Sequence, residues 1–143
     1  MRREDRRMPE EEAWQMLKEA RVCRLAFIAG GKPCVVPLSH VVMGRKLYFH
    51  SAPAGEKVEA IGEGAEVCAE VDEILGRMLD CEGYRSVIVR GRCAPVRDAR
   101  LHGAILGEIM SKYNPDYKAS AKSLAEVVTY EVDIREITGK AKR

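Results

Sequence analysis

Two short turn signals, each next to runs of strand-forming residues, restrict this chain to a small set of folds. The first, Gly30-Gly31-Lys32-Pro33, follows the run Val22–Ala29. The second, Gly44-Arg45, separates the runs Cys34–Met43 and Lys46–Ser51. A two-residue connection that begins with glycine is typical of a tight hairpin, and strands joined this closely run antiparallel. This part of the sequence therefore predicts antiparallel strands.

The rest of the chain continues the β pattern. Because Pro37 cannot donate a backbone hydrogen bond, we expect an edge, a bulge or a break in pairing within its run. Further strands are predicted at Ala65–Val71, Tyr84–Val96 and Val127–Ile137. Gly91 indicates a bend or bulge in the second of these.

Helices are predicted at three places. Pro9 suits the first helical position, and apolar residues at helical spacing follow it. Lys57–Gly62 predicts a short helix, and Asp98 suits the N-cap of a helix that ends at Tyr113. Asp72–Gly83 is compatible with a helical turn or with a loop. About six strands, joined mostly by hairpins, favour a small antiparallel barrel with flanking helices over a doubly wound parallel sheet.

Length and charge narrow the functional classes. The 143 residues predict a single domain, 1–143, and 24 basic residues nearly balance 22 acidic ones, so nucleic acid is not an expected partner. No apolar run approaches the roughly 18 residues that span a bilayer, and the charged start Arg2–Arg7 does not resemble a signal peptide. We therefore expect no membrane partner and a cytoplasmic location.

The cysteines and histidines do not form a metal-site pattern. An odd number of cysteines without a CxxC pair favours buried free thiols over zinc ligands or a disulfide framework. His40 and His102 lie in no spacing typical of a metal site or catalytic triad. The scattered cysteines are Cys23, Cys34, Cys68, Cys81 and Cys93.

An anion site is predicted where the Lys46–Ser51 run ends. Ser51 is the last residue of this run, and a turn of small residues follows it. Lys57 lies in the first turn of the next predicted helix. A hydroxyl, an ammonium and free backbone N–H groups together suit a phosphate. A solvated surface lysine is the alternative interpretation. His50 is either a structural strand residue or a ligand-contacting one.

Several short motifs, in this order, resemble the flavin-binding split-barrel superfamily of pyridoxamine-phosphate oxidase, and within it the nitroimidazole-resistance (Nim-type) branch. The resemblance spans roughly residues 8–140. Its motifs are Pro37-Leu38-Ser39, Leu47-Tyr48-Phe49-His50-Ser51 followed by Lys57, Tyr84-Arg85-Ser86-Val87 through Gly91, and Ile137-Thr138-Gly139-Lys140.

This resemblance implies a mainly β (α+β) fold, namely a six-stranded antiparallel split β-barrel of Greek-key type with flanking helices. It also implies a homodimer that binds two FMN molecules between its subunits. Ser51 and Lys57 would hold the phosphate, and His50 would lie near the flavin as the candidate catalytic residue. Ser86 would approach the flavin from a neighbouring strand. The isoalloxazine would lie along Val36, Pro37, Leu38 and Ser39.

The resemblance favours an FMN-dependent oxidoreductase that passes two electrons to a small organic acceptor, such as a nitroaromatic. Oxidation of pyridoxamine phosphate itself is not expected, because Val35, His40 and Glu56 stand where those oxidases carry basic residues. Two alternatives are a flavin-binding or storage module without turnover, and a split barrel that binds haem or a deazaflavin.

Overall fold

The computed structural model describes residues 2–76, 83–116 and 126–143. Within these ranges the chain forms a seven-stranded antiparallel sheet, three α-helices and a short 3-10 helix, η1 (Glu4–Arg6). The helices are α1 (Glu10–Glu19), α2 (Glu56–Ile61) and α3 (Ala99–Tyr113). The strands are β1 (Cys23–Ala29), β2 (Lys32–Leu38), β3 (Val41–Met43), β4 (Lys46–Ser51), β5 (Ala65–Leu75), β6 (Gly83–Pro95) and β7 (Val128–Lys142).

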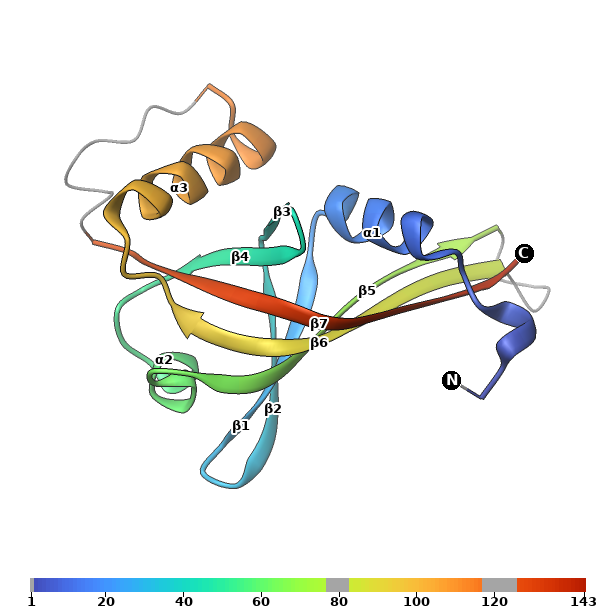
Figure 1. The fold of residues 1–143 in the computed structure, drawn as a ribbon, viewed down its shortest axis with the longest axis horizontal. Helices are drawn as coiled ribbons and strands as arrows, with labels where there is room; N and C mark the ends of the chain where they lie inside the picture. The colour runs from blue at the N-terminus through green and yellow to red at the C-terminus, as the bar shows by residue number, and fades with distance from the viewer. Residues whose placement is uncertain (1, 77–82, 117–125) are drawn as a thin grey trace.

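The strand order β2-β1-β5-β6-β7-β4-β3 places β2 and β3 at opposite ends of the sheet. Nevertheless only Ser39 and His40 separate these two strands in the sequence. The sheet must therefore curl until its two ends approach each other at this link, although no ladder joins them among the described residues. Figure 1 shows the β1–β2 hairpin projecting from the long strands β5, β6 and β7.

The prediction of six strands is wrong, because the run Cys34–Met43 forms two strands, β2 and β3. The pairing of β2 ends at Leu38, and the backbone groups of His40 bond to a side chain instead of a neighbouring strand. The His40 N–H donates to the Tyr113 hydroxyl over 3.0 Å, and that hydroxyl donates to the His40 carbonyl over 2.9 Å. Of the three alternatives for Pro37, namely an edge, a bulge or a break in pairing, the structure shows the edge, since β2 is an outer strand.

Local signals in the sequence are otherwise well matched. Gly30, Gly31 and Gly44 adopt positive φ angles of 56°, 76° and 63° in the two predicted turns. Asp98 is the N-cap of α3 and accepts a hydrogen bond from the Leu101 N–H over 2.9 Å. The predicted irregularity at Gly91 is a register shift between β6 and β7.

Two predicted boundaries need correction. β5 extends to Leu75, so the first part of Asp72–Gly83 is a strand rather than a helical turn or loop. Residues 77–82 of that segment lie outside the described residues. β7 continues to Lys142 instead of ending at Ile137, because β6 supplies pairing partners as far as Tyr84.

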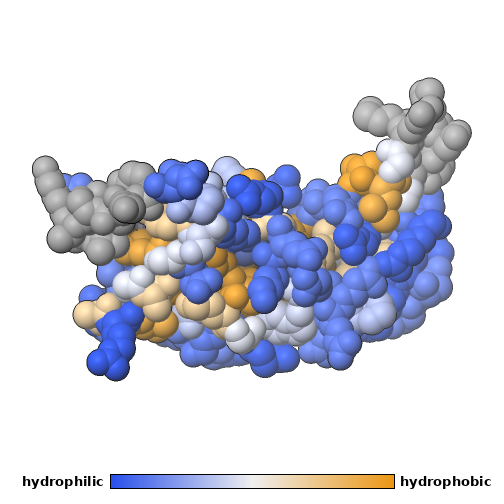
Figure 2. Space-filling view, turned by 90° about the horizontal axis from the view of Figure 1, so that it is seen from above, coloured by the Kyte–Doolittle hydropathy of each residue, from blue (hydrophilic) through white to orange (hydrophobic). Residues whose placement is uncertain are grey.

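The helices cover the sheet at separate places (Figure 1). α1 lies close to β7, where a Cβ atom at Gly139 would come within 3.1 Å of the Ala13 Cβ. α3 packs Ile105 and Ile109 against Val41 and Tyr48 in a second apolar cluster beside the main core. The upper face is mostly hydrophilic, with hydrophobic surface near its ends (Figure 2). No helix in the described ranges combines the length and apolarity needed to cross a bilayer.

Four of the cysteines lie in the described residues, and all four are free. Cys23 and Cys93 are buried as predicted, and burial raises the pKa of each thiol to about 12. Cys34 and Cys68 are only half-buried, so the expectation of full burial is wrong for these two. Cys81 lies outside the described residues.

Candidate functional site

A pocket of about 490 Å³ lies where β4 ends and α2 begins. One wall comes from Phe27 and Val36 of the β1–β2 hairpin, and another from His50 and Ser51 of β4. The segment 52–58, excluding Pro53, completes the lining. The structure thus brings together four of the predicted site residues: Val36, His50, Ser51 and Lys57.

Lys57 is a half-buried cation in this pocket. Its Nζ atom lies 5.6 Å from the centroid of the Phe49 ring. Partial burial lowers the pKa of Lys57 below its ordinary value. Within the described part of the chain, no carboxylate forms an ion pair with Lys57. A partly desolvated ammonium without a carboxylate partner is suited to receive an anion.

Ser51 is the last residue of β4 and is 8% exposed. Its hydroxyl donates to the Ala52 carbonyl over 2.9 Å, and its oxygen retains the capacity to accept a hydrogen bond. The turn that follows ends at Gly55, whose φ angle of 130° favours glycine at that position. α2 then begins at Glu56, so Lys57 lies in its first turn as predicted.

Glu56 precedes Lys57 in α2 and interacts with Cys34 of the β1–β2 hairpin. Burial, followed by hydrogen bonding to the Glu56 carboxylate, raises the pKa of the Cys34 thiol. The Glu56 carboxylate therefore interacts with Cys34 of the hairpin, and it forms no ion pair with Lys57 in the described part of the chain. This contact between α2 and β2 could not be read from the Glu56-Lys57 dipeptide alone.

His50 lies opposite Thr129 in the β4–β7 ladder and lines the same pocket. Its pKa is lowered, first by partial loss of hydration and then by the positive charge of Lys57. The imidazole is therefore biased toward its neutral form, in which one ring nitrogen donates a hydrogen bond and the other can accept a hydrogen bond or a proton.

The remaining predicted site residues lie outside this pocket. Pro37 and Ser39 are exposed along β2 and the link that follows it, whereas Leu38 is 8% exposed. Ser86 lies on β6, between Asp72 and Lys140 in the ladder. Because β6 is three strands from β2 in the sheet order, strand spacing places Ser86 roughly 14 Å away from that strand.

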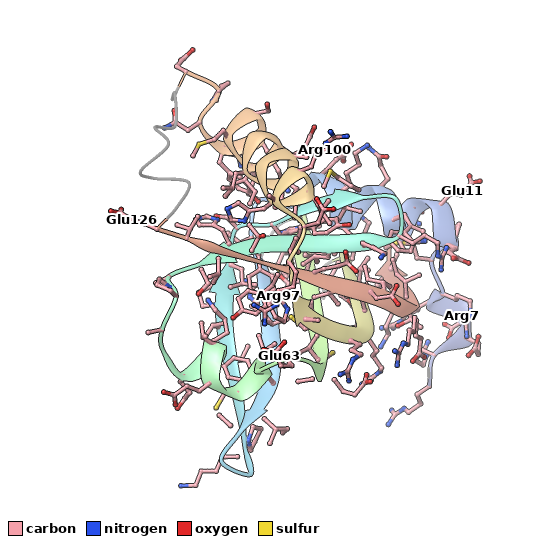
Figure 3. The ribbon with its side chains drawn as sticks, turned by 60° about the vertical axis from the view of Figure 1, so that its left-hand side comes forward. Arg7, Glu11, Glu63, Arg97, Arg100 and Glu126 are labelled. Carbon is pink, nitrogen blue, oxygen red and sulfur yellow. The ribbon has the colours of Figure 1, made fainter. Side chains whose placement is uncertain are left out.

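An ion pair connects the two segments that flank this end of the sheet. Arg97 follows β6 and Glu63 follows α2, and Figure 3 shows the two side chains close together. The Arg97 Nη2 atom lies 2.6 Å from Glu63 Oε1 and 2.7 Å from Oε2. Both side chains are highly exposed, so the pair contributes little to stability.

The sequence profile described as pyridoxamine 5'-phosphate oxidase matches residues 9–141. The chain belongs to the pyridoxamine 5'-phosphate oxidase family. This confirms the resemblance inferred from the motifs around Pro37, Ser51 and Ser86. A comparison with curated proteins finds no match.

Solved structures of this family share the fold. A candidate 5-nitroimidazole antibiotic resistance protein from Bacteroides thetaiotaomicron superposes with a TM-score of 0.82 at 23% identity, covering 94% of this chain and 86% of that one. An FAD-binding protein from Mesorhizobium loti is 30% identical, with a TM-score of 0.76 over 96% of this chain and 98% of that one. An FAD-binding protein from Mycobacterium smegmatis is 26% identical, with a TM-score of 0.69 and the same two coverages.

No group of three or more His, Cys, Asp or Glu side chains in the described ranges is arranged to hold a metal ion. The inspection of single residues in the sequence missed a second feature, a buried polar junction around His40. It depends on side chains that follow His40 by about 70 positions in the sequence. A tyrosine and a lysine near a helix C-terminus are too common to have signalled it.

Proposed function

We propose that this family member binds a flavin mononucleotide and acts as an oxidoreductase, with Ser51 and Lys57 holding the phosphate. The observation that carries the proposal is the half-buried Lys57 ammonium, which faces a pocket of about 490 Å³ without a carboxylate partner among the described residues. A phosphate would supply the missing negative charge and accept hydrogen bonds from both side chains. The names of the two FAD-binding relatives support a flavin ligand.

The strand β2 is well placed to meet the ring system. Val36 lines the same pocket as Lys57, and residues 37–39 continue from it along an outer edge of the sheet. A flavin held by its phosphate at Lys57 would therefore extend its isoalloxazine along Val36–Ser39. Backbone N–H and C=O groups on an outer edge lack a strand partner and can bond to a ring.

Ser86 supports a two-subunit site. It is separated from β2 by β1 and β5, so Ser86 of the same chain is far from a ring that lies along β2. Ser86 can therefore contact the flavin ring only if it comes from a second copy of the chain. The proposed site is a cleft between two subunits, to which each copy contributes different residues.

The outer face of the sheet offers a surface for that second copy. Ile28, Val35 and Ile88 are 59%, 65% and 36% exposed. The ladder registers place all three on the face opposite the buried Leu25 and Phe27, because side chains alternate along each strand. Exposed apolar side chains that share one face of a sheet can contribute to an interface, and here Arg24 and Glu70 lie on the same face between Ile88 and β2.

In this arrangement the flavin, when bound, would carry two electrons from a donor such as a reduced nicotinamide to a small organic acceptor, for which a nitroaromatic is our first candidate. The protein would orient the ring, exclude water, and donate or accept protons during the reaction. His50 is our candidate for the last role, because its imidazole is biased toward the neutral form and shares a pocket with Lys57.

The visible absorption spectrum of the purified protein tests the proposal. A flavin complex should absorb near the usual flavin bands, and anaerobic NADPH should bleach them if the protein turns over. Protein that is colourless and does not take up added FMN would contradict the proposal. Titrations with FMN, FAD and riboflavin, run in parallel, identify which flavin is preferred.

Two alternative functions give different spectra. A storage or sensing module would form a stable yellow complex that NADPH does not reduce at a useful rate. A haem protein would show an intense Soret band, and a deazaflavin complex would show a blue-shifted absorption. The buried His40 is a poor axial ligand for haem, because its side chain is already bonded to the Leu17 carbonyl in α1.

A further inference from the structure

His40, one of the two residues that join the outer strands β2 and β3, is held by hydrogen bonds to two helices. It is completely buried, and its backbone N–H and C=O both bond to the Tyr113 hydroxyl at the end of α3. Its ring Nε2 lies 2.7 Å from the Leu17 carbonyl in α1. Two helices from distant parts of the chain therefore fix a single residue of the link.

Lys112 is the central donor of this junction. Its Nζ atom donates to the His40 carbonyl over 2.8 Å and to the Ala20 carbonyl over 2.7 Å. Ala20 is the C-cap of α1, where backbone carbonyls lack partners within the helix and favour a cation. One ammonium thus bonds the C-terminal end of α1 to the link between the strands.

Further contacts hold the end of α3 in place. The Arg21 Nη1 atom donates to the Lys112 carbonyl over 2.8 Å, and the Arg21 guanidinium lies 4.7 Å from the centroid of the Tyr113 ring. The Lys112 Nζ atom lies 5.0 Å from the same centroid. The Tyr113 ring is therefore restrained by two cations as well as by its hydrogen bonds to His40. These contacts keep the Tyr113 hydroxyl and the Lys112 ammonium close to the His40 backbone.

The orientation of the His40 ring determines what the junction can do. Burial lowers the pKa of His40 to about 4, so the ring is neutral, and Nε2 carries the proton donated to Leu17. The bond to the Leu17 carbonyl directs Nε2 toward α1, whereas Nδ1 is buried and has no hydrogen-bond partner among the described residues. The bonds from α3 hold the backbone of His40 and not its ring.

The residues that directly precede His40 are those along which the isoalloxazine would lie. We propose that Lys112 and Tyr113 are positioning residues of the flavin site: by holding the backbone of His40 they set the path of Val36–Ser39 against the ring. The inference rests on the proposed function. It adds a role for α3, a helix that does not line the phosphate pocket.

The segment Val36–Ser39 needs this support because it lies at the edge of the sheet. β2 pairs with β1 on one side only, and the ladder ends at Leu38. Without the bonds from α3, the Ser39-His40 backbone would exchange its partners with water and sample several conformations. Contacts between a backbone and a ring edge require placement within about half an ångström, so such freedom would weaken ring binding.

The test separates ring binding from phosphate binding. Dissociation constants for FMN and for riboflavin, which lacks the phosphate, are measured for the wild type and for Lys112→Met, Tyr113→Phe and Lys57→Met. We expect Lys112→Met to weaken both ligands by the same factor, about fivefold to tenfold, because a displaced β2–β3 link loosens the contacts to the ring that both ligands share. Lys57→Met should weaken FMN and leave riboflavin unchanged. Lys112→Arg should restore most of the affinity for both ligands.

Two further measurements distinguish positioning from a general loss of structure. Hydrogen exchange of the backbone amides of Leu38–Val41 in the flavin-free protein should accelerate in Lys112→Met, while the amides of α2 keep their wild-type rates. The absorption maximum of bound riboflavin should shift in Lys112→Met and stay constant in Lys57→Met. If Lys112→Met fails to fold, Tyr113→Phe provides the same comparison.

The possible outcomes are distinct. If the wild type binds neither FMN nor riboflavin, the proposed function fails, and so does this inference. If the wild type binds both, but Lys112→Met and Tyr113→Phe leave the riboflavin constant and the exchange of Leu38–Val41 unchanged, the inference fails and the proposed function stands. Weaker binding of FMN alone in Lys112→Met would also overturn it, because the effect would then be on the phosphate.

Discussion

The Lys57 ammonium lies 5.6 Å from the centroid of the Phe49 ring, at the mouth of a pocket that also contains Ser51. A ring face attracts a cation but does not neutralise it. Burial lowers the pKa of Lys57 below its ordinary value, and no carboxylate in the described ranges forms an ion pair with it.

We predict that Lys57→Met weakens FMN binding by about 1–3 kcal/mol, or roughly fivefold to 150-fold, because one charge-assisted hydrogen bond to the phosphate is lost. Isothermal titration calorimetry measures the change. Lys18→Met is the matched control, since Lys18 is an exposed lysine on α1, away from the pocket. An unchanged constant in Lys57→Met would remove this residue from the phosphate site.

Acid should destabilise the protein through His40. Its pKa is about 4 when folded and 6.5 ordinarily, so between these values the unfolded chain binds the extra proton. The stability that His40 contributes is therefore complete above pH 6.5 and is lost as the pH falls toward 4. The loss is on the order of 3 kcal/mol. Urea unfolding at several pH values measures it.

The His40→Gln variant should be less stable at neutral pH and should show a flatter dependence over this range, because no ring titrates. His50→Gln is its control. The pKa of His50 is lowered in the same direction, but this residue is exposed, so most of the wild-type slope should remain. Parallel pH profiles for wild type and His40→Gln would be inconsistent with a neutral buried ring.

The proposed subunit contact can be tested at Val35. Its side chain is 65% exposed on the outer face, so Val35→Asp should leave the fold intact while placing a charge in the interface. We expect a dimer to become a monomer by sedimentation velocity, with ring binding lost because Ser86 of a second copy is removed. Ala99→Asp, at an exposed position on α3, is the control. A monomeric wild type that still binds flavin would rule out the shared cleft.

Gly91 should not tolerate a side chain. A Cβ atom there would overlap the backbone oxygen of Asp133 at the irregularity between β6 and β7. Gly91→Ala should lower the free energy of unfolding by about 1–3 kcal/mol, measured by chemical denaturation. Gly103→Ala in α3, where no atom lies within 4 Å of the added carbon, should instead raise stability by about 0.5–1 kcal/mol. Equal effects of the two substitutions would contradict this account.

The elements that could be predicted from the sequence are those whose signals are local. The glycines at the two hairpin turns, the Asp98 cap and the bulge at Gly91 each act within a few residues. The division of Cys34–Met43 into two strands was not predictable in this way. It depends on Tyr113, which is 73 positions away from His40.

The residues of the candidate site also fall into two groups, those that local sequence signals predict and those that depend on distant parts of the chain. Ser51 and Lys57 are six positions apart, and a strand, a turn and a helix bring them to one pocket as expected. The wall formed by Phe27 and Val36 comes from a hairpin that packs against α2, and no local pattern indicates it. Ser86 cannot be joined to this pocket within one chain, so its predicted role depends on assembly.

Pro33 and Pro37 lie in β2, an outer strand of the sheet, and neither has a backbone N–H. A further strand laid against this edge would lack two donors and could not extend the ladder in register. Copies of the protein are thereby prevented from polymerising strand by strand along that edge. Copies that associate would therefore do so through side chains on the faces of the sheet. Packing of that kind can form a closed assembly of a few copies instead of a fibre.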